Sequence, residues 1–400
     1  MLVNQAYRYE LKPNNIQKTI LAKHAGTARF AWNWALAQRT KPQNRAAINQ
    51  HRDWNVWKRK NAPWWVEISK CVPQESFRDL DKAFSNFFKI RKDNSFRART
   101  AKAKPRKDGE PYGYPKFKKK GVHDSFMLTG TIHVLDNTIQ LPRLGKIRTK
   151  ENTAKFKGRI LSATVNKEAD RWFVSLSVEV EREIPVWNDN EVVGIDLGIK
   201  SFAVVYDGNN TEYIYAPKPL DKNLKKLQRA SKKHSRKQRG SNNKLKSTIR
   251  LARLHRLIRN QRNDFLHKTT TTLAKTKSVI VIEDLNIKGM VQNHCLAKSI
   301  SDVGWGDFRR MLEHKTTWYG SKLAVIGRFV PSSKTCSECG AVNNNLTLSN
   351  RTWVCMNCSA VHKRDENAAK CIRHAGLEIL VPRVPREFTP VEIPLTAEQR

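Results

Sequence analysis

The sequence predicts an α+β protein of several domains: a small β-barrel that carries inserted helices, followed by a mixed α/β domain with a cysteine-rich insertion. The length of 400 residues corresponds to two or three domains, and the 39% of hydrophobic residues can build ordinary cores. Along the chain, the apolar pattern changes from helical spacing to strand-like alternation and then to short, fully apolar runs. These changes mark the expected domain boundaries.

The charge of the chain identifies its partner class. The sequence has 75 Lys and Arg against 36 Asp and Glu, a formal net charge of +39, which exceeds what solubility requires. A chain this basic repels itself unless a polyanion neutralises it. It has no run of about 20 apolar residues, and its first residues, "MLVNQAYRYELKPN", lack the apolar core of a signal peptide. We therefore expect a cytoplasmic protein that binds nucleic acid and has no membrane partner.

Two segments hold much of this charge. Residues 218 to 262 include seventeen Lys or Arg and a single acid, Asp221, and predict two basic helices joined around "RGSNNK". A second basic segment, residues 91 to 120, is rich in Pro and Gly and predicts a linker or a groove loop. The first segment could be a solvated face, but its single sign of charge favours contact with phosphates. The candidate residues are Lys225, Arg229, Lys232 and Arg236.

The first third of the chain combines helices with strands. Residues 14 to 39 predict a helix capped by Asn14 or Asn15, and an apolar helix face follows at Phe77, Leu80, Phe84, Phe87 and Phe88. Four tryptophans, at positions 54, 57, 64 and 65, could stack on bases or fill this helical core. Residues 122 to 182 alternate as strands do, and "VNQAYRYEL" near the start would join their sheet. The helices are therefore predicted to be inserted into a small β-barrel.

Three acids follow apolar strands or open a helix in the second half of the chain. Asp196 ends the first strand of a buried hairpin, Glu283 ends the strand "SVIVIE", and Asp365 lies in the first turn of a late helix. Each of these acids taken alone would ordinarily be a structural residue that caps a helix or ends a strand. Together they match the metal-binding pattern of RNase H-like nucleases, in which carboxylates hold two Mg²⁺ ions about 4 Å apart. An acidic cluster in a basic chain is what phosphodiester cleavage needs.

Four cysteines predict a structural zinc ribbon. The pair Cys336 and Cys339 is separated by fifteen residues from the pair Cys355 and Cys358. Four thiolates form a closed tetrahedral site without room for a reactive water. Cys71, Cys295 and Cys371 are expected to be buried or idle thiols. The ribbon lies between the strand "LAVIGRFV" and the helix with Asp365, and it should fix where that helix begins.

The chain resembles the TnpB family. The members of this family are RNA-guided DNA endonucleases of bacterial insertion sequences, and they are related to compact type V CRISPR nucleases. The resemblance covers nearly the whole chain and rests on the blocks "GTARFAWN", "YPKFKKKG", "GIDLGIKSFAV", "DFLHK", "IEDLNIKGM", "SISDVGWGDFRRMLEHKTTWYG", "PSSKTCSECG" and "HKRDENAA". It implies a wedge β-barrel at residues 1–15 and 118–190, recognition helices at 16–117, a RuvC-like nuclease domain at 191–335 and 361–378, a nucleic-acid-binding zinc ribbon at 336–360, and a disordered tail at 379–400.

The resemblance also implies the activity. A monomeric protein would bind a transposon-derived guide RNA, recognise a short motif beside its double-stranded DNA target, and cut with one Mg²⁺-dependent site, near the prokaryotic nucleoid. The family's catalytic acids fall on Asp196, Glu283 and Asp365. A Lys-x-x-x-Gln pair that family members use on base edges matches Lys70 and Gln74. The alternatives are a DNA-joining transposase and an RNA-guided regulator that does not cut.

Overall fold

A computed structural model describes residues 1–39, 46–92, 113–122, 124–154, 156–183, 192–347 and 349–380. The chain forms two compact units, the first made of Met1–Glu183 with Ala230–Arg256 and the second of Ile184–Arg229 with Leu257–Arg400. We describe each unit by itself. Most of the basic linker predicted at 91–120 and nearly all of the predicted tail lie outside the described residues.

A seven-stranded antiparallel sheet forms the base of the first unit. Its order is β2-β6-β7-β1-β5-β4-β3, and the strands span Ser125–Leu128 (β2), Arg159–Glu168 (β6), Arg171–Glu181 (β7), Leu2–Lys12 (β1), Gly145–Thr149 (β5), Thr138–Leu141 (β4) and His133–Leu135 (β3). β1 pairs with β7 from Leu2↔Glu181 to Leu11↔Trp172, which confirms that the first strand joins the later sheet. No pairing among the described residues joins β2 to β3, so a closed barrel is not shown.

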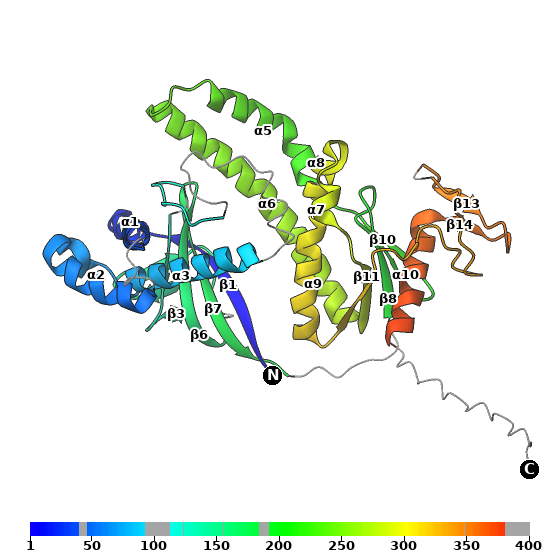
Figure 1. Ribbon diagram of the computed structural model, residues 1–400, viewed down its shortest axis with the longest axis horizontal. Helices are drawn as coiled ribbons and strands as arrows, with labels where there is room; N and C mark the ends of the chain where they lie inside the picture. The colour runs from blue at the N-terminus through cyan, green and yellow to red at the C-terminus, as the bar shows by residue number, and fades with distance from the viewer. Residues whose placement is uncertain are drawn as a thin grey trace, which may run out of the picture. The chain divides into compact units, whose positions relative to one another are not determined.

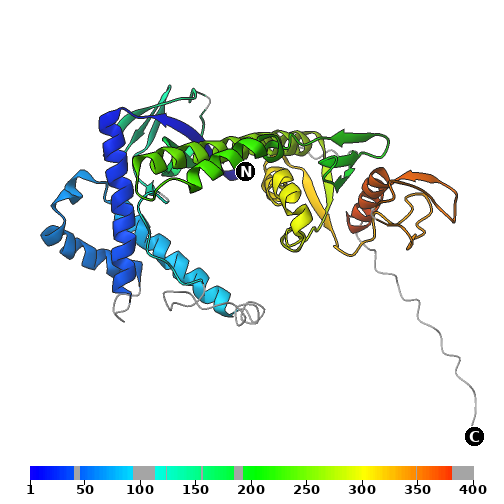
Figure 2. The same ribbon diagram turned by 90° about the horizontal axis from the view of Figure 1, so that it is seen from above.

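The helices of the first unit pack on this sheet and on one another. They are α1 (Asn15–Gln38), α2 (Ala47–Asn61), the 3₁₀ helix η2 (Pro63–Glu67) and α3 (Cys71–Lys92). Asn14 caps α1 in a reciprocal capping box with Gln17, as its side chain predicts. Leu21 and Ala25 of α1 are buried against the sheet, and Figure 2 shows α1 beside these strands. The helical insertion is therefore anchored through α1.

An aromatic core holds the three α-helices together. Phe77, Leu80, Phe84 and Phe87 of α3 are buried around Trp54, which is 1% exposed, so Trp54 is a core residue. The prediction that Phe88 belongs to this face was wrong, because Phe88 is 56% exposed. A helix turns about 100° per residue, and consecutive Phe87 and Phe88 therefore cannot both point into one narrow core.

A five-stranded mixed sheet forms the base of the second unit, in the order β10-β9-β8-β11-β12. β8 (Val192–Leu197), β9 (Ala203–Tyr206) and β10 (Thr211–Ile214) are antiparallel, whereas β11 (Val279–Glu283) runs parallel to both β8 and β12 (Lys322–Ile326). The predicted hairpin and the predicted central strand are both confirmed. Parallel pairing of β8 and β11 places their carboxyl ends at the same edge of the sheet.

Helices cover both faces of this second sheet. One face packs on α6 (Asn242–Thr276), α8 (His294–Val303) and α9 (Trp305–Tyr319), and the other on α10 (Arg364–Leu380) (Figures 1 and 2). A Cβ at Gly194 of β8 would lie 2.2 Å from the carbonyl oxygen of Ala369, and one at Gly376 of α10 would lie 2.3 Å from Val281. Both glycines thus allow α10 to lie directly on the strands.

The remaining elements are a helical hairpin, a short helix and a ribbon. The basic segment forms α5 (Pro219–Ser235) and α6, which run through both units, so the two predicted basic helices are confirmed. The short helix α7 (Ile287–Met290) follows β11. The two-stranded ribbon of β13 (Thr352–Val354) and β14 (Val361–Lys363) leads directly into α10.

Candidate functional site

Strand alternation directs two of the candidate acids toward α10. Ile280 and Ile282 of β11 pack on the α9 side of the sheet, whereas Val279 and Val281 pack on the α10 side. Glu283, two residues after Val281, therefore faces α10. On β8, Gly194 lies under α10, and Asp196 shares its face by the same alternation. Ile195 pairs with Ile282, so the two carboxylates follow neighbouring positions of parallel strands.

The third candidate acid, Asp365, lies in the first turn of α10, the helix that covers this face. The three carboxylates are close enough to affect one another. Burial above all, together with the negative charges of Glu283 and Asp365, raises the pKa of Asp196 to about 7, partly opposed by Arg364. The structure thus brings the three acids together at the edge of the sheet.

The acids next to them in sequence are engaged elsewhere. Asp284 binds Arg309 (2.5 Å) and Arg328 (2.6 Å), and the hydrogen bond from Arg309 in particular lowers the pKa of Asp284. Glu366 accepts hydrogen bonds from Tyr213 (2.6 Å) and from Lys363 (3.1 Å). Of the consecutive acids Glu283 and Asp284, and likewise of Asp365 and Glu366, the first therefore belongs to the shared cluster and the second forms an ion pair at its border.

Two contacts reach the acidic cluster, one from the loop after β12 and one from the cysteine ribbon. The Ser332 hydroxyl donates a hydrogen bond to the Glu283 carboxylate. The Arg351 guanidinium lies 3.6 Å from the Asp365 carboxylate. Neither residue can be predicted from sequence, because a hydroxyl in a loop and an arginine in a ribbon give no signal until the fold brings them to their partners.

The cluster has the donor chemistry for hard divalent cations. Carboxylate oxygens are the ligands that Mg²⁺ prefers, and the pKa of Asp196 is raised first by burial and then by the negative charges of Glu283 and Asp365. Among the described residues, only the four cysteines form a group with all ligand atoms within 4.8 Å, so the carboxylates are spaced more widely. Two ions about 4 Å apart, with bonds of about 2 Å, can span ligands up to about 8 Å apart.

The four cysteines form the second candidate metal site. Cys336, Cys339, Cys355 and Cys358 place all their sulfur atoms within 4.8 Å of one another. The Cys336–Cys358 and Cys339–Cys355 sulfur distances are both 3.6 Å, close to the roughly 3.8 Å expected for a tetrahedron with Zn–S bonds of about 2.3 Å. Hydrogen bonds from Asn357 and the Ala341 backbone, and from neighbouring cysteines, lower the pKa of Cys339 to about 6, whereas the hydrogen bond to Cys339 is among the causes that raise the pKa of Cys358, so the thiols share protons. The cluster fits a zinc-binding site.

Asn367 joins this cysteine cluster to the helix that carries Asp365. Its side chain, in a residue that is 1% exposed, accepts a hydrogen bond from the Ser337 amide (2.9 Å) and donates one to the Thr335 carbonyl (2.6 Å). Both partners flank Cys336. Asn367 lies two residues after Asp365, so the first cysteine pair is tied to the first turns of α10.

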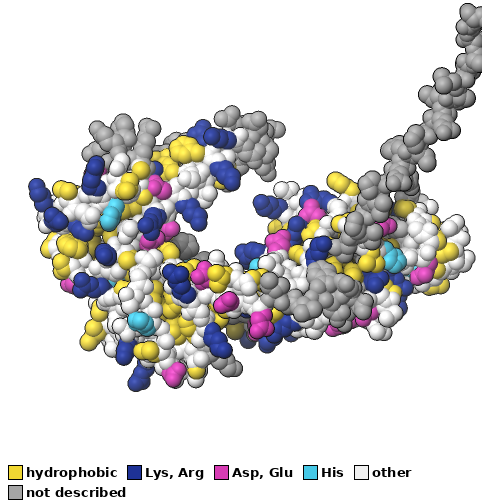
Figure 3. Space-filling model, turned by 90° about the horizontal axis from the view of Figure 1, so that it is seen from below, with side chains coloured by type: hydrophobic (Ala, Val, Ile, Leu, Met, Phe, Trp, Pro, Cys, Tyr) yellow, Lys and Arg dark blue, Asp and Glu magenta, His cyan; other side chains and the backbone are white. Residues whose placement is uncertain are grey.

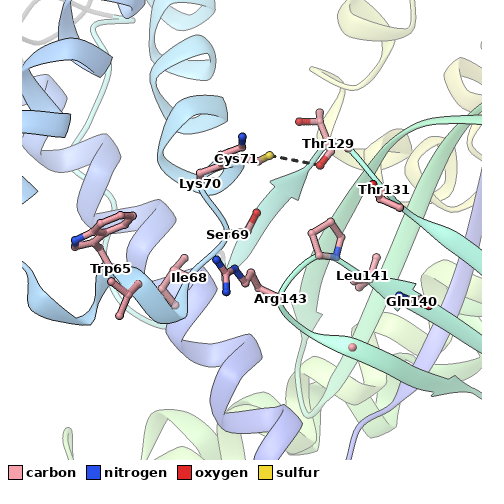
Figure 4. A pocket seen from close by; sticks show the side chains of 14 residues that line it. Trp65, Ile68, Ser69, Lys70, Cys71, Thr129, Thr131, Gln140, Leu141 and Arg143 are labelled. Atoms are coloured by element: carbon pink, nitrogen blue, oxygen red, sulfur yellow. Dashed lines mark hydrogen bonds between the residues drawn. The ribbon is translucent and has the colours of Figure 1, made fainter.

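The two candidate motif-reading residues lie in the first unit. Lys70 precedes α3 and is exposed, whereas Gln74 lies in the first turn of α3 and is half-buried. Lys70 lines a pocket of about 760 Å³. The opposite wall includes Thr129, Thr131 and Arg143, and the Cys71 thiol bonds the Thr129 carbonyl across the pocket (Figure 4). Gln74 is not among the residues that line this pocket.

The candidate phosphate-binding residues are exposed. Three of them lie within α5 at helical spacing, and the fourth lies just after its end: Lys225, Arg229, Lys232 and Arg236. Lys and Arg side chains are also spread over both units on the face shown in Figure 3. The described helices include none that is long and apolar enough to cross a membrane.

Three parts of the chain match models of known protein families. Residues 175–294 match a family model described as "Probable transposase", residues 305–372 match "Cas12f1-like, TNB domain", and residues 1–44 match "Helix-turn-helix domain". The described residues of the last match form β1 and α1. The second match contains all four cysteines and Asp365.

Whole-chain relatives are also found. A Streptomyces pristinaespiralis protein named "Putative RNA-guided DNA endonuclease" is 35% identical over 382 residues, covering 94% of this chain and 90% of the relative. "Putative RNA-guided DNA endonuclease InsQ" of Escherichia coli K12 is 31% identical over 401 residues, covering 94% and 93%. A solved Cas12f1–sgRNA–target DNA complex aligns with 93% of this chain and 99% of its own, at 14% identity and a TM-score of 0.47.

The family matches place the chain in the transposon-associated class, and the four-cysteine ribbon lies within the match to the Cas12f1-like TNB domain. The identity and coverage of the whole-chain relatives are more specific. This chain belongs to the TnpB family, the family of these proteins named as RNA-guided DNA endonucleases.

Proposed function

We propose that this protein is an RNA-guided DNA endonuclease whose single cleavage site is formed by Asp196, Glu283 and Asp365. The observation that supports this most directly is the convergence of three carboxylates on one sheet edge, where burial and the charges of Glu283 and Asp365 raise the pKa of Asp196 to about 7, in a chain of net charge +39. The relatives' names supply the RNA-guided part of the proposal.

The sheet order supports an RNase H-like, RuvC-type nuclease fold for the second unit. Three antiparallel strands are followed by two strands parallel to the first, and the proposed acids lie on the first strand, the fourth strand and a late helix. In the first unit, the seven-stranded sheet would be the wedge domain and α1 to α3 the recognition helices. A particle with one protein copy is part of this proposal.

In this mechanism the three carboxylates would hold two Mg²⁺ ions, and the chemistry that these ions would supply is activation of a water and stabilisation of the leaving oxygen of the phosphodiester. Asp196 would be deprotonated when it holds a cation, because the positive charge would offset the burial and the repulsion that raise its pKa. Ser332 would orient the Glu283 carboxylate through its hydrogen bond. Arg351 would be displaced from Asp365 or turn toward a phosphate, since its 62% exposed side chain is free to move.

The other basic and cysteine residues would bind and position the nucleic acids. Lys225, Arg229, Lys232 and Arg236 would contact phosphates without regard to sequence, as suits a protein whose guide RNA reads the target. Lys70 would read the target-adjacent motif from its pocket, with Gln74 one helical turn away. Zinc in the four-cysteine ribbon would be structural and would fix the start of α10 through Asn367.

The test is to purify the protein, sequence the RNA that copurifies, and replace the guide segment of that RNA. A DNA library with random bases beside the matching target is then offered with Mg²⁺. We expect cleavage that follows the new guide and requires a short adjacent motif, and we expect Gln74→Ala to change that motif. Guide-independent strand-transfer products would support the transposase alternative. Specific binding without any cutting would support the regulator alternative.

A further inference from the structure

The loop after β12 exposes one aromatic ring next to the acidic cluster. Phe329 is 94% exposed, more than any other large hydrophobic residue of the described chain. Single exposed apolar residues are common on protein surfaces. A nearly complete exposure of a phenyl ring is unusual, however, because even partial contact with neighbouring side chains would remove apolar area from water.

Contacts on both sides of Phe329 hold this loop in place. On one side, Arg328 donates to the Asp284 carboxylate (2.6 Å) and to the Asp284 carbonyl (3.2 Å). On the other side, Ser332 donates to the Glu283 carboxylate. The loop is also closed on itself, since the Val330 amide donates to the Gly327 carbonyl (3.2 Å) and the Ser332 amide donates to the Val330 carbonyl (2.9 Å).

These contacts fix the ring beside the end of β11. The residues that flank Phe329 bind two consecutive acids, one of which is the proposed catalytic Glu283. The loop therefore cannot swing the ring away to a hydrophobic core without breaking contacts to the site. A strand whose phosphate lies at the acids would carry its bases past this ring.

We propose that Phe329 is a stacking residue for an unpaired base of the DNA strand that is cut at Asp196, Glu283 and Asp365. A phenyl ring accepts any base, because every base has a π-face, and so it holds a strand without reading its sequence. A base within a duplex has both faces covered by its neighbours, so the ligand is a single-stranded segment. This inference rests on the proposed function, which requires a displaced or opened strand at the site.

The chain offers matched variants for the test. Phe329→Ala removes the ring, and Phe329→Trp keeps an aromatic face. Ile379→Ala is the control, because Ile379 is 60% exposed near the other end of α10 and away from the acidic cluster. Both positions are exposed, so thermal melting followed by circular dichroism should be the same for all variants.

The experiment measures single-turnover cleavage by the guide-loaded protein on a target with an intact base or an abasic site next to the cut phosphate. We expect Phe329→Ala to slow cutting of the intact target roughly 5- to 150-fold, the effect of losing one stacked base. Phe329→Trp and Ile379→Ala should cut at the normal rate. On the abasic target, wild-type protein should be as slow as Phe329→Ala, which should lose nothing further.

The outcomes separate this inference from the proposed function. If wild-type protein cuts and Phe329→Ala matches it on both targets, the stacking role is wrong and the nuclease assignment stands. If Phe329→Ala is slower by the same factor on the intact and abasic targets, the ring acts through the loop or another partner, which also overturns the proposal. If wild-type protein does not cut guided targets at all, both proposals fail.

Discussion

Replacing Asn367 with alanine should weaken zinc binding although no cysteine is touched. The substitution removes the acceptor of the Ser337 amide and one donor to the Thr335 carbonyl. The Thr335 carbonyl still accepts from the Cys371 thiol at 3.2 Å, so the main loss is one half-buried amide, that of Ser337, left without its acceptor. Such a group costs about 1–3 kcal/mol. These bonds exist only when the ribbon is folded on α10, and zinc binding is linked to that folding.

We therefore expect the apparent zinc affinity of Asn367→Ala to fall about 30-fold, the equivalent of about 2 kcal/mol. The assay is competition between the protein and a chromogenic zinc chelator. Asn367→Asp keeps an oxygen for the Ser337 amide but loses the donor to Thr335, so it should fall between alanine and wild type. Asn345→Ala, at an exposed position of the same ribbon, is the control. Equal affinities for Asn367→Ala and wild type would refute the link.

Three further predictions concern the ribbon, the basic helix and a buried lysine. Cys336→Ser or Cys358→Ser should release zinc and lower cleavage far more than DNA binding, whereas Cys295→Ser should do neither; metal analysis that finds no zinc in active wild-type protein would contradict this. Burial lowers the pKa of Lys315 to about 8. The free-energy cost of burying its charged amine is therefore fully present below pH 8, and it is relieved as the pH rises toward the pKa that Lys315 has in the unfolded chain. Between pH 8 and pH 10 we expect stability to urea to rise by about 1–3 kcal/mol relative to Lys315→Met, and parallel pH profiles would count against it. The third change replaces four basic side chains with glutamine: Lys225, Arg229, Lys232 and Arg236. It should flatten the salt dependence of nucleic-acid binding by roughly one unit of log-log slope per lost contact, and an unchanged slope would mean that these side chains only face solvent.

The candidate acids could be predicted from sequence because their positions depend on local pattern. An apolar run followed by an acid predicts a strand end, and parallel strands place such ends at one edge. Asp196 and Glu283 follow this rule, and Asp365 follows from the helix start beside the ribbon. The four-cysteine ribbon could be predicted for the same reason, because the spacing of its cysteines is a local pattern. That these acids do the chemistry remains a proposal.

The supporting contacts could not be predicted in the same way. Ser332, Arg351 and Asn367 act on partners up to 49 residues away in sequence, and only the packing of α10 and the ribbon on the sheet defines them. Periodicity also overstated one face, since it assigned Phe88 to a core that already holds Phe87. Alternation predicted the strands of the first unit, but the predicted closed barrel is not shown, because closure depends on the pairing of the two end strands of the sheet.

The most direct test of the central claim is single-turnover cleavage of a guide-matched target as Mg²⁺ is varied. Asp196→Ala, Glu283→Ala and Asp365→Ala should each bind guide and target nearly as wild type does, but cut about a thousandfold more slowly at saturating Mg²⁺. The control is Asp264→Ala, an exposed acid of α6 in the second unit, which should cut normally. Cutting at the normal rate by any one of the three variants would contradict the assignment of that carboxylate to the metal site.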